Sequence, residues 1–175
     1  MSKSQSQGNS KVVTGIPGFD DILKGGLPPR RLYLLQGAPG AGKTTMALQF
    51  LLTGARAGEK VLYISLSETR EEVEEVAASH GWSLEGVEIV ELSAIEQQLS
   101  AQAQNTLFHA SEIELTETTR MLLDAVERIQ PRRVAFDSLS ELRLLSQTPL
   151  RYRRQILSFK QYLAGRNARR CSWMT

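Results

Sequence analysis

Gly37-Ala38-Pro39-Gly40-Ala41-Gly42-Lys43-Thr44 is the stretch that decides the fold. It fits the pattern G-x-x-x-x-G-K-[ST] in full, which average composition would produce by chance in roughly 1 in 200 chains of this length. Glycines allow the backbone to curl so that several N–H groups point inward, and the N-terminus of the following helix adds positive potential. The stretch therefore predicts a loop that binds the phosphates of a nucleoside triphosphate.

The side chains of this loop predict its ligands, ATP and Mg²⁺. Lys43 is expected to reach the β- and γ-phosphates and to assist catalysis, and the Thr44 hydroxyl is expected to ligate Mg²⁺. Thr45 is interpreted as a helix-packing residue or an α-phosphate contact. The residues predicted to bind the nucleotide are Gly37, Ala38, Pro39, Gly40, Ala41, Gly42, Lys43, Thr44 and Thr45.

The segments around the loop alternate between predicted strands and helices. The strands are expected at 31–35, 61–66, 87–92 and 133–136. The helices are expected from after Phe19 through Leu23, at 43–57, from Thr69 to about 80, at 118–130 and at 148–165. Thr69 and Glu72 have the spacing of a capping box. Alternation of this kind is typical of α/β proteins with a mainly parallel sheet, whose ligands bind at the carboxyl edge.

Two carboxylates are predicted to act beside the loop. Asp137 ends an apolar strand, which is the position for an acid that holds Mg²⁺ directly or through water. Glu68 follows the strand that begins at Val61, and a carboxylate there can orient or deprotonate the attacking water. The alternative for Glu68 is an acid at a helix start, favoured by the helix dipole.

Composition predicts a single, soluble, cytoplasmic domain. The only cysteine is Cys171, which excludes an internal disulfide, and no run of about 18 apolar residues predicts a membrane span. Residues 1–11 are polar and are expected to form a disordered tail. His80 and His109 lack the spacing of a metal site, and both are interpreted as structural residues, with His80 on the apolar side of its helix.

The charge is divided unevenly along the chain. Residues 1–127 carry 10 basic and 17 acidic residues, whereas residues 128–175 carry 11 basic and 2 acidic residues. A basic end of this kind can attract nucleic acid. Because few aromatic residues are interleaved with the arginines, we favour a surface that faces solvent or a neighbouring subunit.

Several segments beyond the loop resemble the KaiC-like ATPases of the RecA/RadA superfamily. The resemblance is carried by the phosphate loop and by Thr14-Gly15-Ile16-Pro17-Gly18-Phe19-Asp20, Gly25-Gly26-Leu27-Pro28, residues 133–139 and residues 152–157. It runs from about Val12 to Arg166. It implies a RecA-type core, a cytoplasmic location, ATP hydrolysis and a homo-oligomeric ring, usually hexameric, with ATP between subunits. For relatives of the circadian-clock type it also implies serine/threonine autophosphorylation.

The chain departs from the family pattern at two places. Where the family usually shows paired glutamates after the second strand, this chain has Ser67-Glu68, so only Glu68 can serve as a base. Where the family has a further buried strand, residues 168–175 form a basic tail that fits no strand. We therefore expect a partial domain over 12–167, with C-terminal strands absent and an edge exposed on one side of the Asp137 strand or of its neighbour.

The tail also predicts an error of reading frame. Back-translation from Arg169 with CGN arginine codons and TCN serine, read two nucleotides later, yields small residues, then three apolar residues (Leu, Val or Met, then Leu or Phe, then Leu, Val or Met), then two aspartates. Those residues would supply the strand that the family shows at this point. An open continuation of the gene in the shifted frame is the observation that would support this hypothesis.

Three functions remain open at this stage. The first is a KaiC-like ATPase domain, with Mg²⁺-dependent hydrolysis. The second is a RadA-like recombination protein that binds DNA, which the basic end supports but which we do not favour. The third is a regulatory module that binds ATP and assembles without turnover.

Overall fold

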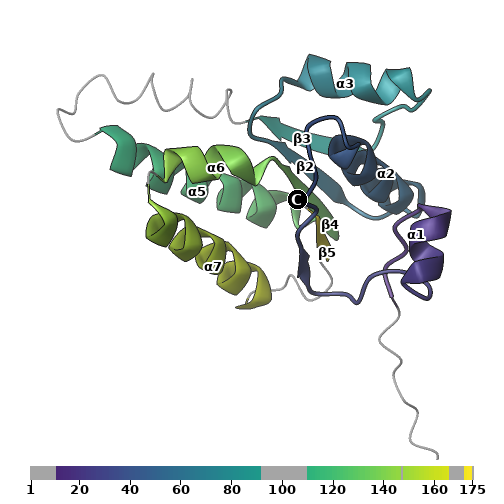
Figure 1. The fold of residues 1–175 in the computed structure, drawn as a ribbon, viewed down its shortest axis with the longest axis horizontal. Helices are drawn as coiled ribbons and strands as arrows, with labels where there is room; N and C mark the ends of the chain where they lie inside the picture. The colour runs from purple at the N-terminus through teal and green to yellow at the C-terminus, as the bar shows by residue number, and fades with distance from the viewer. Residues whose placement is uncertain (1–10, 92–109, 147, 166–171, 175) are drawn as a thin grey trace, which may run out of the picture.

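The computed structural model describes residues 11–91, 110–146, 148–165 and 172–174, which form a parallel sheet between two layers of helices (Figure 1). The strand order is β1-β5-β4-β2-β3, and every pairing is parallel. The strands are β1 (Leu32–Tyr33), β2 (Val61–Ser65), β3 (Val87–Glu91), β4 (Arg133–Asp137) and β5 (Ser172–Met174). The helices are α1 (Pro17–Ile22), α2 (Lys43–Arg56), α3 (Arg70–Ser79), α5 (Ala110–Ile129), α6 (Leu139–Leu145) and α7 (Pro149–Gly165). The predicted α/β class and its parallel sheet are confirmed.

Strand β2 runs through the middle of the molecule and supplies side chains to two cores. Val61 and Tyr63 pack with α2 and α3 on one face, whereas Leu62 and Ile64 pack with α5, α6 and α7 on the other. The period of two in a strand produces this division. Figure 1 shows α2 and α3 on one side of the sheet and α5, α6 and α7 on the other.

The start of α3 is closed by the predicted capping box. Glu72 donates its backbone N–H to the Thr69 hydroxyl at 3.3 Å, and Thr69 donates its own N–H to the Glu72 carboxylate at 2.8 Å. Val73 and Ala77 are the buried residues of this helix, as its sequence pattern predicts. The capping box places Glu72 close enough to Glu68 for its charge to raise the pKa of the Glu68 carboxyl group.

The N-terminal segment, residues 12–27, is stabilised by hydrogen bonds to Asp20 and is joined to α2 by a hydrogen bond from Gln49. Asp20 accepts hydrogen bonds from the Thr14 hydroxyl and from the backbone N–H groups of Thr14 and Gly15, at 2.8 to 2.9 Å. Gln49 of α2 donates to the Gly15 carbonyl at 2.6 Å. Gly15 has a φ of 82°, and a Cβ there would lie 1.9 Å from the Thr53 hydroxyl. The approach of this segment to α2 therefore requires glycine.

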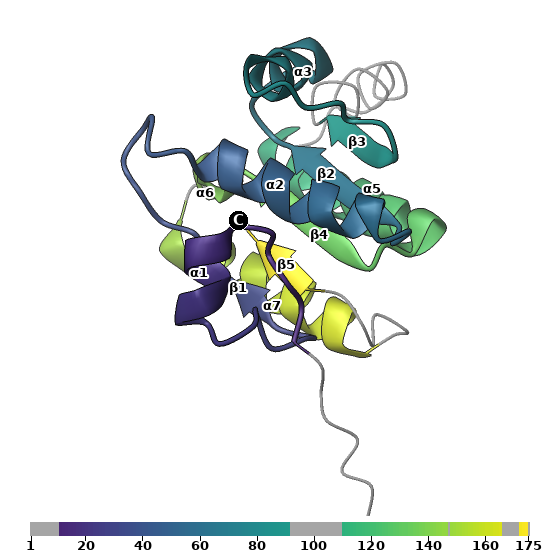
Figure 2. The ribbon, with the colours of Figure 1, turned by 90° about the vertical axis from the view of Figure 1, so that its right-hand side faces the viewer.

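The tail forms a strand, so the prediction that residues 168–175 fit no strand is wrong. Ser172–Met174 form β5, which lies between β1 and β4 (Figure 2). Trp173 is in register with Leu32 and Val134. Strand β4 therefore has a partner on each side, and the exposed edge expected near Asp137 does not form there. A three-residue strand between two others is held by main-chain ladders on both sides, so it needs no long apolar run.

Two helices also differ from the sequence prediction. Helix α5 begins at Ala110, earlier than the predicted start at Thr118, and α6 was not predicted. Helix α6 is short, and Leu142 buries it against α5 and α7. Tertiary packing rather than helical propensity accounts for a helix of this length.

Candidate nucleotide-binding site

The predicted phosphate-binding loop, residues 37–44, connects β1 to α2 at the carboxyl edge of the sheet. Gly42 stands at the N-cap of α2 with a φ of 80°, in the left-handed region that favours glycine, and no side chain caps this helix. Gly40 also has a positive φ, of 76°. A helix start with N–H groups that no side chain caps is a site for an anion, because the donors and the helix dipole both favour negative charge.

Lys43 holds its ammonium group across this loop. Its Nζ donates to the carbonyl oxygens of Gly37 and Ala38, at 3.0 Å each. These bonds keep the positive charge at the loop, where the sequence places the phosphates. The same ammonium donors are chemically suited to phosphate oxygens.

Thr44 and Asp137 meet as the sequence predicts, although 93 residues separate them. The Thr44 hydroxyl donates to Asp137 Oδ2 at 2.6 Å. Arg133 and Ala135 of β4 face α2, and by the period of two Asp137 faces the same way at the end of the strand. The first turn of α2 therefore lies against the carboxyl end of β4.

Tyr63 is a third member of this cluster, and sequence reasoning missed it. Its hydroxyl donates to the same Asp137 Oδ2 at 2.8 Å, and its side chain is fully buried. Burial raises the pKa of Tyr63 far above its ordinary range, and the adjacent charge of Asp137 raises it further. A signal was available, because a tyrosine within an otherwise aliphatic buried strand needs a partner for its hydroxyl.

Glu68 lies on the loop after β2, as predicted. Its Oε2 is buried without a hydrogen-bond partner among the described residues. Ser65 binds the backbone of Glu68, since its hydroxyl accepts from the Glu68 N–H and donates to the Glu68 carbonyl. Burial raises the pKa of Glu68, and the nearby charges of Asp137 and Glu72 add to the effect. A carboxyl group in this state is suited to proton transfer.

Thr45 lies beside His80, which is not on the apolar side of its helix. The His80 ring is exposed, stacks on Trp82 with ring centroids 4.7 Å apart, and places Nε2 3.4 Å from the Thr45 hydroxyl. His80 follows the last residue of α3, where the helical period no longer directs side chains toward the core. His109 lies outside the described residues.

The donor set suits Mg²⁺ held together with a nucleotide. Within the described ranges, no group of three or more His, Cys, Asp or Glu side chains could hold a metal ion alone. Thr44 and Asp137 offer oxygen atoms, and Mg²⁺ commonly takes one or two protein oxygens and completes its shell with phosphates and water. The residues present therefore fit the predicted ion. No helix in the described part of the chain has the length and apolar character of a membrane span.

Comparisons with known proteins point to one family. A family model described as "ATPase: KaiC" matches residues 12–170. A UPF0273 protein of Pyrococcus horikoshii is 34% identical over 160 residues, which are 89% of this chain and 64% of that protein. A UPF0273 protein of Thermotoga maritima is 32% identical over 160 residues, with 89% and 65% covered. The chain therefore spans about two thirds of the length of these relatives.

Two further matches carry the name of KaiC itself. The circadian clock oscillator protein KaiC of Prochlorococcus marinus is 32% identical over 142 residues, which are 80% of this chain and 27% of that protein. The crystal structure of a KaiC-like protein from P. horikoshii superposes with a TM-score of 0.72 at 26% identity, covering 94% of this chain and 70% of that one. The sequence relatives and the structural neighbour thus agree.

Proposed function

The chain belongs to the KaiC family of ATPases, and on that premise we propose that it binds ATP with Mg²⁺ and hydrolyses the terminal phosphate. The observation that carries the proposal is the hydrogen bond between Thr44 and Asp137 at 2.6 Å. It joins the phosphate-binding loop to the acid at the end of β4, which are the two parts that a Mg²⁺–triphosphate complex requires.

The direction of the Thr44 hydroxyl explains how Thr44 and Asp137 would hold one Mg²⁺ ion together. Thr44 uses its single hydrogen toward Asp137, so the lone pairs of its oxygen are free to face a cation. Asp137 is then expected to bind the hydration shell of the ion and to orient Thr44. When bound, Mg²⁺ neutralises charge on the β- and γ-phosphate oxygens. Lys43 and the uncapped N–H groups of α2 would hold the phosphates themselves.

Glu68 is proposed as the general base for the attacking water. Its Oε2 has no hydrogen-bond partner in the described part of the structure, and its raised pKa marks a carboxyl group that exchanges protons nearer to neutrality. In its ionised form it would accept a proton from water. Because Ser67 stands where the family usually has a second glutamate, Glu68 carries this role alone.

Lys43→Ala tests the proposal. We expect it to weaken binding of ATP–Mg²⁺ about tenfold or more, because a charge-assisted hydrogen bond to phosphate is lost, and to abolish phosphate release. Lys60→Ala is the matched control, since the exposed Lys60 precedes β2 at the opposite edge of the sheet. Isothermal titration and a phosphate-release assay give the two readouts. Wild-type protein with no affinity for ATP–Mg²⁺ at millimolar concentration would contradict the proposal.

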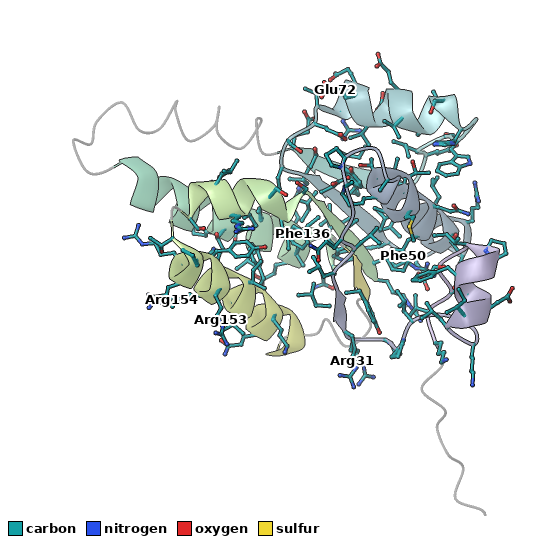
Figure 3. All side chains as sticks on the ribbon, viewed as in Figure 1. Arg31, Phe50, Glu72, Phe136, Arg153 and Arg154 are labelled. Atoms are coloured by element: carbon teal, nitrogen blue, oxygen red, sulfur yellow. The ribbon has the colours of Figure 1, made fainter. Side chains whose placement is uncertain are left out.

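The proposal also includes ring assembly, with ATP between subunits, and serine/threonine autophosphorylation. Membership of the KaiC family supports both of these properties. DNA binding is the alternative that one observation favours, because Arg153 and Arg154 are exposed on α7 and directed away from the sheet (Figure 3). Binding of single-stranded DNA that weakens steeply with salt would select that alternative.

A further inference from the structure

Tyr63 carries a polar hydroxyl at a position of β2 where the strand itself requires only an apolar side chain. The other apolar positions of β2 are aliphatic, yet this position carries a phenol that is fully buried. Its hydroxyl, 74 residues away in sequence from Asp137, ends 2.8 Å from the carboxylate. Burying a phenol hydroxyl without a hydrogen-bond partner costs free energy. The Tyr63 hydroxyl avoids this cost by bonding to Asp137, and it thereby links the core to the site.

The register of the sheet determines how Tyr63 reaches the site. Ser65 pairs with Asp137 and Tyr63 pairs with Ala135, and Tyr63 and Ala135 both pack in the core beneath α2. The ring of Tyr63 therefore extends along the sheet face toward the carboxyl edge, beneath α2. Its backbone sits in a central strand that is paired on both sides, and its ring is packed, so the hydroxyl has little freedom to move.

Two hydroxyl groups converge on one carboxylate oxygen. Thr44 donates to Asp137 Oδ2 from the loop side at 2.6 Å, and Tyr63 donates to the same atom from the core side at 2.8 Å. Thr44 belongs to the loop that receives the nucleotide, whereas Tyr63 belongs to the rigid core. Of the two donors, Tyr63 is the one that belongs to the packed core, and its hydroxyl also interacts with the side chain of Thr44.

We propose that Tyr63 is the positioning residue of the Mg²⁺ site, acting through Asp137 from the buried side of the sheet. This inference rests on the proposed function and deepens it. The phenol fixes the orientation of the Asp137 carboxylate, and Asp137 in turn directs the hydrogen of Thr44 so that the lone pairs of Thr44 face the ion. Tyr63 touches neither nucleotide nor metal.

The same arrangement separates the two carboxylates of the site by role. Tyr63 has one hydrogen to donate and gives it to Asp137, while Glu68 Oε2 is left without a hydrogen-bond partner among the described residues. Asp137 is therefore fixed as the acid that orients the ion, and Glu68 remains free to take a proton from water. Removing the phenol should affect the ion and leave the phosphate contacts of Lys43 intact.

Tyr63→Phe is the direct test, with Tyr33→Phe as the matched control. Tyr33 also donates its hydroxyl hydrogen, to the carbonyl oxygen of Pro28 at 2.6 Å. This partner is a backbone carbonyl and not the Asp137 carboxylate. For Tyr63→Phe we expect the Mg²⁺ concentration for half-maximal ATP binding and hydrolysis to rise about tenfold, while ATP affinity in EDTA stays within about twofold. The control should change neither quantity.

Two spectroscopic measurements and a double variant extend the test beyond turnover. Mn²⁺ bound with ADP, followed by electron paramagnetic resonance, reports the metal site without hydrolysis and should show the same weakening. In wild-type protein saturated with ADP, addition of Mg²⁺ should shift the ring Cζ resonance of Tyr63 and leave that of Tyr33 unchanged. A double variant with Asp137→Asn should be no worse than Asp137→Asn alone, because Tyr63 acts through Asp137.

The outcomes separate this inference from the proposed function. An unchanged Mg²⁺ dependence in Tyr63→Phe, or a lower melting temperature as its only effect, would show that the phenol is merely structural. A Tyr63 Cζ chemical shift that does not change on addition of Mg²⁺ would also overturn the inference. Wild-type protein that binds no nucleotide under any condition would instead overturn the proposed function.

Discussion

At the scale of single residues, Asp137 and Glu68 are two carboxylates in one site with opposite surroundings. Asp137 accepts two hydrogen bonds on a single oxygen, one from the Thr44 hydroxyl and one from the Tyr63 hydroxyl. Glu68 has a buried oxygen without a partner in the described structure, and burial together with the charges of Asp137 and Glu72 raises its pKa. Such a difference in hydrogen bonding and burial suits the two carboxylates to different chemical roles.

Glu68→Gln should separate binding from hydrolysis. We expect ATP affinity to persist and hydrolysis to fall about 100-fold, since a general base contributes that order of rate. In wild-type protein the raised pKa means that Glu68 ionises at a higher pH. The apparent pKa of the acid limb of the pH–rate profile should therefore lie above the ordinary glutamate pKa of about 4.3. A pH–rate profile checks this, with Glu71→Gln on the exposed face of α3 as the control. A variant as active as the wild type would rule out Glu68 as the base.

The same group predicts a dependence of stability on pH. Folded protein retains the Glu68 proton to a higher pH than unfolded protein does, so stability is lost as pH rises from the unfolded pKa through the folded one. Glu68→Gln removes that loss. The variant should melt at a higher temperature than wild type near neutral pH, and the difference should vanish in acid.

At the scale of elements, two helix starts on the same face of the sheet differ in how their N–H groups are satisfied. Helix α3 is closed by the Thr69 and Glu72 capping box, whereas α2 begins at Gly42 with no side-chain cap. The first arrangement stabilises the fold. The second leaves donors available to a ligand, and this is the physical difference between a structural helix start and an anion site.

Thr69→Ala measures the structural half of this contrast. Loss of the cap should cost about 1 kcal/mol of stability, whereas Thr69→Ser, which keeps the hydroxyl, should cost much less. Chemical denaturation followed by circular dichroism gives both values. Equal stability of the alanine and serine variants would mean that the hydrogen bond from Glu72 contributes nothing.

At the scale of the whole molecule, Arg133 joins the sheet to the N-terminal segment and to α2. Its guanidinium donates to the carbonyls of Val13 and Phe50 at 2.7 and 2.9 Å, bonds Glu59 at 2.5 Å, and lies 4.8 Å from the centre of the Phe50 ring. The residue is only 4% exposed. A buried charge with this many partners ties together three parts of the chain that the sequence separates widely.

Arg132 and Arg133 form a natural matched pair, because both bind Glu59 but only Arg133 is buried. The side chain of Arg132 is 43% exposed, and its Nε lies 3.0 Å from the Glu59 carboxylate. Arg133→Met should lower the free energy of unfolding by about 3 kcal/mol. Arg132→Met should lower it by less than about 1 kcal/mol. Urea denaturation of the two variants checks the difference, and equal losses would show that burial of Arg133 is unimportant.

The local features of this protein were determined by the sequence alone. The phosphate-binding loop, the Thr69 capping box and most helices and strands depend on residues within a few positions of one another, so their patterns can be read directly. The parallel sheet also followed from the alternation of strands and helices. Asp137 and Glu68 were predicted as site residues because Asp137 ends a strand, and Glu68 follows a strand, whose apolar pattern can be read from the sequence.

Only the tertiary structure decided which distant groups meet. Tyr63 joins Asp137 through strand register, His80 turns toward Thr45 where α3 ends, and β5 pairs between β1 and β4 through main-chain ladders rather than through an apolar pattern. Each depends on contacts between segments far apart in the chain. A local sequence pattern carries no record of such contacts, because they arise only when the sheet brings those segments together.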